Sequence, residues 1–136
     1  MAKQGIDLHT SSFNQALAAE YLSGGFLETQ LPKIISLYCP KQEAMLKALE
    51  DHMPKSYRWS KPDGGMFIWL EGPDGLDAVK VYPKAIERNV AYVPGKFFYA
   101  DPNEGFNTMR LNFTMSSADA LYNAVKTLAE VLKTAG

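Results

Sequence analysis

The sequence predicts an α+β domain of two layers, in which a small mixed or antiparallel sheet carries its helices on one face. Three observations support this fold class. Apolar residues recur at helical spacing in several stretches, short strand patterns lie between them, and turn residues separate most of these elements. The expected order is helix, helix, strand, strand, helix, strand, strand, helix. We find no internal repeat or linker, so residues 1–136 are expected to form one domain.

Two helices are expected before the first strand. Ser11 or Ser12 is a residue type that caps a helix, and apolar residues follow it at helical spacing. Gly24-Gly25 is expected to end this first helix. A second helical run extends from about residue 26 to residue 52. Pro40 is expected to kink this helix or divide it in two, because proline lacks an N–H donor and clashes with the preceding turn.

Four strands and two further helices are expected in the rest of the chain. The strand patterns cover residues 57–59, 66–70, 90–93 and 108–114. A helix containing Pro83 is expected over residues 78–88. In the last helix, Ser116 and Asp119 approximate a capping box. The buried stripe of that helix is expected to be Leu121, Val125, Leu128 and Leu132.

Composition restricts the possible functions. The chain has 136 residues, 46% of them apolar, and a net charge of −1 with acidic and basic residues interspersed. There is no basic block for nucleic acid or a membrane surface, and no apolar run long enough to cross a bilayer. Cys39 is the only cysteine, which excludes a disulfide within the chain. A soluble cytoplasmic protein is the expectation, with neither nucleic acid nor a membrane as partner.

Arg110 is the strongest candidate functional residue. It lies inside the apolar strand pattern Met109-Arg110-Leu111-Asn112-Phe113, where a cation is costly unless it meets an anion. Its partner can be an Asp or Glu of the protein, or the side chain can extend to water from the strand end. Alternatively, the guanidinium can bind a ligand carboxylate through two parallel hydrogen bonds. The residues alone leave these alternatives open.

The other motifs are less specific. Gly64-Gly65 before Met66 is typical of a tight turn preceding a strand, although it also allows close approach of another group. No metal-ligand cluster, glycine-rich phosphate loop or nucleophile motif is present. The residues therefore predict a globular domain with one unusual arginine.

Three segments together resemble the C-terminal part of class I/II aminotransferases. These segments are Pro62-x-Gly64-Gly65-Met66-Phe67-x-Trp69, Val93-Pro94-Gly95-x-x-Phe98 and Met109-Arg110-Leu111-Asn112-Phe113. The opening Lys3-Gln4-Gly5-x-Asp7-Leu8-His9-Thr10-Ser11 is similar to the segment that follows the large domain in this group. The resemblance implies the small domain of a fold-type I, pyridoxal-phosphate enzyme, nearest to the 2-aminoadipate, kynurenine and multi-substrate aromatic aminotransferases.

The resemblance also implies roles for individual residues. The arginine matching Arg110 binds the α-carboxylate of the amino acid or oxo acid in this family. Phe67 is expected to line the substrate pocket, next to Gly65. Thr10 and Ser11 match a segment that approaches the cofactor site of the neighbouring subunit in the dimer.

The same resemblance places the chemistry outside this chain. The cofactor-binding lysine and most phosphate ligands belong to the large domain, so the chain is expected to hold no catalytic residue, no covalent pyridoxal 5'-phosphate site and no metal, and to be inactive alone. Residues 1–25 are expected to lead from the missing large domain, and residues 26–53 to form the interdomain helix region.

The intact enzyme is expected to be a homodimer that transfers an amino group between an amino acid, aromatic or 2-aminoadipate-like, and a 2-oxo acid such as 2-oxoglutarate. The small domain is expected to bind the substrate carboxylate and close the active site. Two alternatives remain from other classes: the aminotransferase-like effector domain of a MocR/GntR-type transcription regulator, and a non-catalytic binding module.

Overall fold

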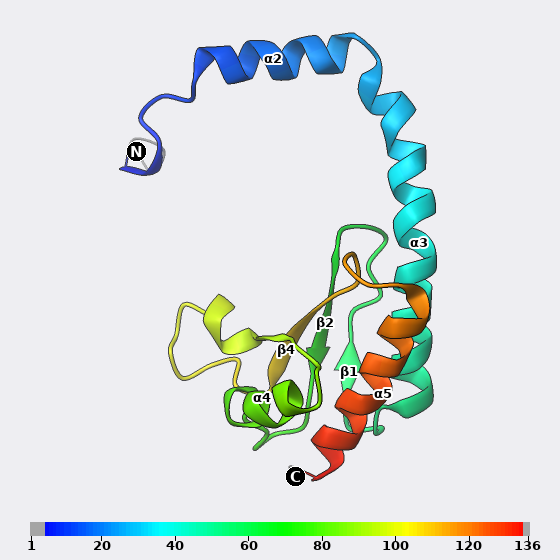
Figure 1. The fold of residues 1–136 in the computed structure, drawn as a ribbon. Helices are drawn as coiled ribbons and strands as arrows, with labels where there is room; N and C mark the ends of the chain where they lie inside the picture. The colour runs from blue at the N-terminus through cyan, green and yellow to red at the C-terminus, as the bar shows by residue number, and fades with distance from the viewer. Residues whose placement is uncertain (1–4, 135–136) are drawn as a thin grey trace. The chain divides into compact units, whose positions relative to one another are not determined.

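The computed structural model describes residues 5–134 and shows the expected order of helices and strands (Figure 1). The chain divides into two compact units, residues 1–37 and residues 38–136, and the division falls within helix α3. No described helix is both long enough and apolar enough to span a membrane.

The first unit contains helix α2 (Ser12–Ser23) and the beginning of α3 (Phe26–His52). Ser11 caps α2 by accepting a hydrogen bond from the backbone N–H of Asn14, and α2 ends before Gly24, as predicted. None of the residues of α2 is buried. Large apolar side chains are exposed along both helical segments: Phe13, Leu17, Tyr21, Leu22, Phe26, Leu27, Leu31, Ile34, Ile35 and Leu37.

Helix α3 runs without a break from Phe26 to His52, so of the two outcomes expected at Pro40, a kink or a division, the division does not occur. A proline removes a single backbone hydrogen bond of the helix, while the neighbouring turns keep theirs. Packing supplies the compensation beyond Pro40, where Met45, Ala48 and Leu49 are buried against the sheet. A helix anchored by such burial tolerates the local loss.

The sheet has four strands, β1 (Arg58–Trp59), β2 (Phe67–Glu71), β3 (Val93–Pro94) and β4 (Thr108–Asn112), in the order β1-β2-β4-β3. Every neighbouring pair is antiparallel, which decides between the mixed and antiparallel alternatives.

Strand β3 is later and shorter than the predicted strand 90–93. The N–H of Val90 donates to the carbonyl oxygen of Ala85, which closes the end of helix α4 (Ala78–Glu87), and Tyr92 is buried. Residues 90–92 therefore connect the end of α4 to the sheet, and backbone pairing with β4 begins only at Val93.

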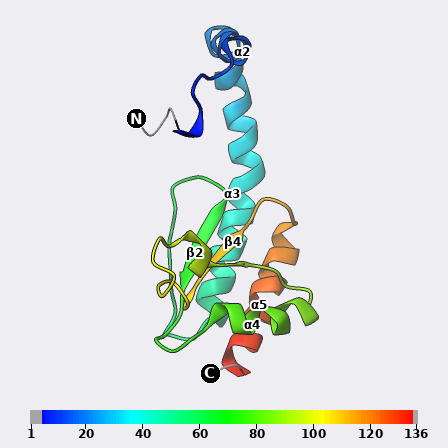
Figure 2. The same ribbon diagram turned by 90° about the vertical axis from the view of Figure 1, so that its left-hand side faces the viewer.

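Alternation along the strands creates two different faces. Ile68, Leu70, Met109 and Leu111 are buried and belong to the same apolar cluster as the inner sides of α3, α4 and α5 (Ala118–Thr134). These helices lie on one side of the strands, as predicted (Figures 1 and 2). Each large apolar side chain buried there contributes roughly 1.5–3 kcal/mol. The opposite face carries Phe67, Trp69 and Arg110, all only partly buried.

Helix α5 follows the predicted stripe, since Leu121, Val125, Leu128 and Leu132 are all buried. Its cap differs from the expectation by one residue. The hydroxyl of Ser117, not Ser116, accepts from a backbone N–H of the first turn. The sequence cannot distinguish two adjacent serines as helix caps, because both are suitable residue types. The residue at which the helix starts decides which of them caps it.

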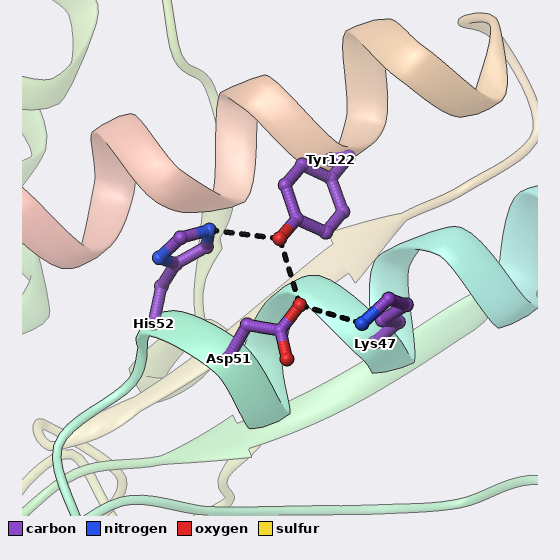
Figure 3. Close-up of polar contacts among 4 residues, drawn as sticks. All are labelled: Lys47, Asp51, His52 and Tyr122. Atoms are coloured by element: carbon purple, nitrogen blue, oxygen red, sulfur yellow. Dashed lines mark hydrogen bonds and ion pairs between the residues drawn. The ribbon is translucent and has the colours of Figure 1, made fainter.

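A cluster of polar contacts connects α5 to the C-terminal end of α3 (Figure 3). The Tyr122 hydroxyl donates to Oδ2 of Asp51 at 2.7 Å, and the same oxygen accepts from Lys47 Nζ at 2.9 Å. His52 Nε2 lies 3.2 Å from the Tyr122 hydroxyl, and the two rings meet edge to face. Hydrogen bonds from Lys47 and Tyr122 lower the pKa of Asp51, and the bond to Asp51 raises the pKa of Tyr122.

These shifts predict the pH dependence of an Asp51→Asn variant. A carboxylate with a lowered pKa stabilises the folded chain above its unfolded pKa of 3.8, and this contribution is lost as the pH falls below that value. We expect the variant to be less stable than the wild type at pH 7, and the difference to shrink below pH 4. Urea unfolding between pH 3 and pH 8 measures it, with Asp63→Asn as an exposed control. A difference that stays constant down to pH 3 would contradict the assignment.

Candidate functional site

Arg110 occupies the centre of the sheet surface that faces away from the helices. In β4 it alternates with Met109 and Leu111, which are buried on the helical side. Strand β2 places Trp69 directly opposite Arg110, and strand β3 places Val93 opposite it on the other side. The antiparallel register therefore surrounds the arginine with side chains from both neighbouring strands.

Two aromatic rings contact the guanidinium of Arg110. Its Cζ lies 4.1 Å from the ring centroid of Phe67 and 4.5 Å from that of Phe98. Each stacked cation–π contact is worth about 0.5–2 kcal/mol, depending on its exposure to water. The Nε atom of Arg110 is buried and has no hydrogen-bond partner.

No acidic side chain among residues 5–134 pairs with Arg110. The ion pairs in this part of the chain are Lys47–Asp51, Lys80–Asp77 and Arg88–Glu130. The alternative of an ion pair with a local Asp or Glu is therefore not realised in the described residues. A buried N–H without a partner costs about 1–3 kcal/mol. A carboxylate that reaches the guanidinium forms charge-assisted hydrogen bonds with its accessible N–H groups.

Arg110 borders an open cleft of about 430 Å³. Burial raises the pKa of the Tyr92 hydroxyl in its wall, and this hydroxyl donates to the carbonyl oxygen of Ala78 at 2.7 Å. Arg110 is the only charged residue of the lining, which contains neither lysine, histidine, cysteine nor carboxylate. The cleft can bind an anion, but its own side chains provide no nucleophile and no general base. The lining residues are Phe67, Tyr82, Ala91, Tyr92, Val93, Arg110 and Asn112.

The structure brings only two of the predicted site residues together, Arg110 and Phe67. Gly65 is not part of the cleft lining and has a φ angle of +87°, which favours glycine in the turn before β2. Thr10 and Ser11 belong to the other unit, where Ser11 caps α2 and the Thr10 hydroxyl donates to Asp7 at 2.7 Å. The roles of Gly65, Thr10 and Ser11 in substrate or cofactor binding stay predictions.

Sequence reasoning did not identify Phe98 as a site residue. It is exposed, lies in the 3₁₀ helix η1 (Gly95–Phe98), and reaches Arg110 only because β3 and β4 are neighbours in the sheet. A signal was present in the sequence, since an aromatic pair follows the turn residues Pro94-Gly95. The strand order, which is needed to interpret that signal, cannot be read from the sequence.

Comparisons with known proteins agree with this fold. The aromatic-amino-acid aminotransferase 1 of Thermococcus litoralis is 47% identical over 133 residues, which cover 98% of this chain and 32% of that protein. Among solved structures, the multiple substrate aminotransferase of Thermococcus profundus matches with a TM-score of 0.85 and 44% identity, over 98% of this chain and 33% of its own. No protein-family model matches.

The chain is related to the aminotransferases and has the fold of their small domain. It spans about a third of the length of the curated relatives that it matches. A third solved structure, the alpha-aminoadipate aminotransferase LysN of Thermus thermophilus, matches with a TM-score of 0.77 and 42% identity over 98% of this chain and 34% of its own. It was solved as a complex with N-(5'-phosphopyridoxyl)-L-leucine.

A protein of a different class also matches the chain, at lower identity. The uncharacterized HTH-type transcriptional regulator YdfD of Bacillus subtilis is 26% identical over 131 residues, which cover 96% of this chain and 27% of that protein. An aminotransferase-like domain is therefore compatible with more than one kind of parent protein.

The cleft at Arg110 does not by itself fit the pyridoxal phosphate that aminotransferases use. Sites for this cofactor supply a lysine for its aldehyde and an acidic or arginine partner for the ring nitrogen. The lining of the cleft has a single arginine and no lysine or carboxylate. Among residues 5–134 there is also no cluster of His, Cys, Asp and Glu placed to hold a metal ion. The donor set fits a carboxylate.

Proposed function

We propose that this chain is the C-terminal small domain of a pyridoxal-phosphate-dependent aminotransferase, in which Arg110 binds the α-carboxylate of the substrate. One observation carries the proposal. The guanidinium of Arg110 contacts two aromatic rings beside an open cleft, has a buried Nε without a partner, and pairs with no acidic residue in the described part of the chain. Its sequence context is that of a chain closely similar to aminotransferases.

The reaction that follows is transfer of an amino group between an amino acid and a 2-oxo acid such as 2-oxoglutarate. Both substrates carry a carboxylate next to the reacting carbon, so a single arginine can hold either of them. The names of the relatives support an aromatic or 2-aminoadipate-like amino acid. We further propose a homodimeric, cytoplasmic enzyme, with Thr10 and Ser11 near the cofactor site of the neighbouring subunit.

The residues of this chain orient the substrate in that reaction. The two parallel N–H groups of a guanidinium fix both the position and the plane of a carboxylate, which helps to align the Cα–H bond for proton removal. Phe67 forms an apolar wall beside the bound group, and closure of the small domain over the site excludes water. The proton transfers and the cofactor belong to the rest of the intact enzyme.

A reaction with the cofactor tests whether the cofactor-binding site lies outside this chain. We expect the 136-residue chain mixed with pyridoxal phosphate to form no stoichiometric adduct that borohydride can trap, because the site residues in this chain include no lysine. Only slow reaction at exposed lysines is expected, which mass spectrometry will find spread over several positions. An intact enzyme carrying the chain serves as the positive control. One stoichiometrically labelled lysine in the chain alone would overturn the proposal that the cofactor site lies elsewhere.

The similarity to YdfD supports a second candidate, the effector domain of a transcription regulator. The two candidates predict different neighbours and activities. An enzyme needs a large domain with a cofactor-binding lysine and should transfer amino groups to 2-oxo acids. A regulator should carry a winged helix-turn-helix segment before its aminotransferase-like body. The sequence of the gene upstream of residue 1 distinguishes them, and such a segment would replace the enzyme proposal.

A further inference from the structure

We infer that Phe98 is a positioning residue that, together with Phe67, holds the guanidinium of Arg110 in the orientation that receives a carboxylate. The inference rests on the carboxylate-binding role proposed above and adds to it. An arginine without an ion-pair partner has many rotamers, and ordering it at the moment of binding costs affinity. A guanidinium already fixed between two rings avoids that cost.

The topology of the sheet explains how the two rings meet. Phe67 comes from β2, on one side of β4, and shares the exposed face of the sheet with Arg110. Phe98 comes from η1, which follows β3 on the other side of β4. Strand β2 and the segment that follows β3 thus each contribute one ring, at 4.1 Å and 4.5 Å from Cζ of Arg110. A guanidinium is planar and its N–H groups lie in that plane, so contacts with aromatic rings leave these donors available to a carboxylate.

Two further contacts hold Phe98 in this place. Trp69, which pairs with Arg110 across the strands, meets the ring of Phe98 edge to face with centroids 5.7 Å apart. Gly95 allows η1 to lie directly on β4, because a Cβ at this position would overlap the Thr108 side chain and lie 2.9 Å from its carbonyl carbon. Phe98 is nevertheless 48% exposed. Its ring therefore adds little to the buried core, and its main contact of interest is with Arg110.

The first test measures the guanidinium itself in the 136-residue chain. NMR relaxation of the Arg110 Nε–Hε group gives its order parameter, which is about 0.85 for a rigid group and below about 0.6 for a flexible one. We expect Phe98→Leu to move Arg110 from the rigid to the flexible range, and Phe98→Tyr to keep it rigid because the ring is retained. Phe97→Leu is the matched control, since Phe97 is 68% exposed. An order parameter unchanged in Phe98→Leu would overturn the inference.

The second test uses the intact enzyme and compares an amino acid with the amine that lacks its α-carboxylate. We expect Phe98→Leu to raise KM for the amino acid about tenfold, because the variant loses one cation–π contact with Arg110. The change in kcat should be smaller. KM for the amine should not change, because it makes no use of Arg110. A residue with a merely structural role would affect both substrates equally, and that result would also overturn the inference.

The same assay separates the inference from the function on which it rests. If Arg110→Lys leaves the preference for the carboxylate-bearing substrate intact, the proposed function of Arg110 fails. If Arg110→Lys removes the preference while Phe98→Leu preserves it, only the role of Phe98 fails. Loss of the preference in both variants, with recovery in Phe98→Tyr, supports both.

Discussion

Replacing Arg110 with lysine in the intact enzyme is expected to lower kcat/KM for both the amino acid and the 2-oxo acid by about 10- to 150-fold, mainly through a higher KM. The figure corresponds to the loss of one or two charge-assisted hydrogen bonds worth about 1.5–3 kcal/mol. Lysine keeps the positive charge but not the planar fork, so it cannot bind a carboxylate through two parallel N–H groups. It also loses the stacking of a flat cation between Phe67 and Phe98.

Steady-state kinetics with each substrate in turn measures this effect. Arg88→Lys is a suitable control, because Arg88 pairs with Glu130 at 2.9 Å and does not line the cleft. A change in Arg110→Lys confined to one of the two substrates would show that the other binds its carboxylate elsewhere. Kinetics unchanged for both would return Arg110 to a structural role on the sheet.

Truncating Phe113 to alanine is expected to lower the free energy of unfolding of the chain by about 3–5 kcal/mol. Phe113 is 1% exposed, and its backbone N–H donates to the carbonyl oxygen of Met66 directly beside β2. Removing the ring leaves a cavity among residues that cannot collapse fully around it. A loss of this size is a large fraction of the stability of a small domain.

Urea unfolding followed by circular dichroism gives the midpoint and the slope of the transition for this variant. We expect Phe113→Leu to lose much less, because most of the buried volume remains. Phe97→Ala is the control for the loss of an aromatic ring from the surface, and its midpoint should stay close to that of the wild type. Equal effects of Phe97→Ala and Phe113→Ala would contradict the placement of Phe113 in the core.

Local patterns were sufficient for most of the secondary structure. The serine before α2, the apolar run of β2 and the stripe of α5 each depend on residues adjacent in sequence or one helical turn apart, and all three appear in the structure. Two differences have another origin, namely that Pro40 does not divide α3 and that residues 90–92 are not part of a strand. In both places long-range packing outweighs a local preference, through burial of the C-terminal part of α3 and of Tyr92.

Only part of the candidate site could be predicted from the sequence. Arg110 is conspicuous by itself, because a cation inside an apolar strand needs an explanation. The sequence also predicted Phe67, through the resemblance. The order β1-β2-β4-β3 was needed to place Phe98 beside the same arginine, since its segment is separated from Arg110 by a loop and pairing between distant strands has no local signature.

The sequence by itself determined the class of the fold, the order of its elements and the arginine at the centre of the site. These follow from the periodicity of apolar residues and from the cost of burying a charge, and both can be read along the chain. Only the tertiary structure decided that no acidic residue in the described part of the chain neutralises Arg110, and that rings from β2 and from η1 both contact its guanidinium. The physical reason is that ion pairing and stacking depend on distances between residues far apart in sequence, which only the folded sheet sets.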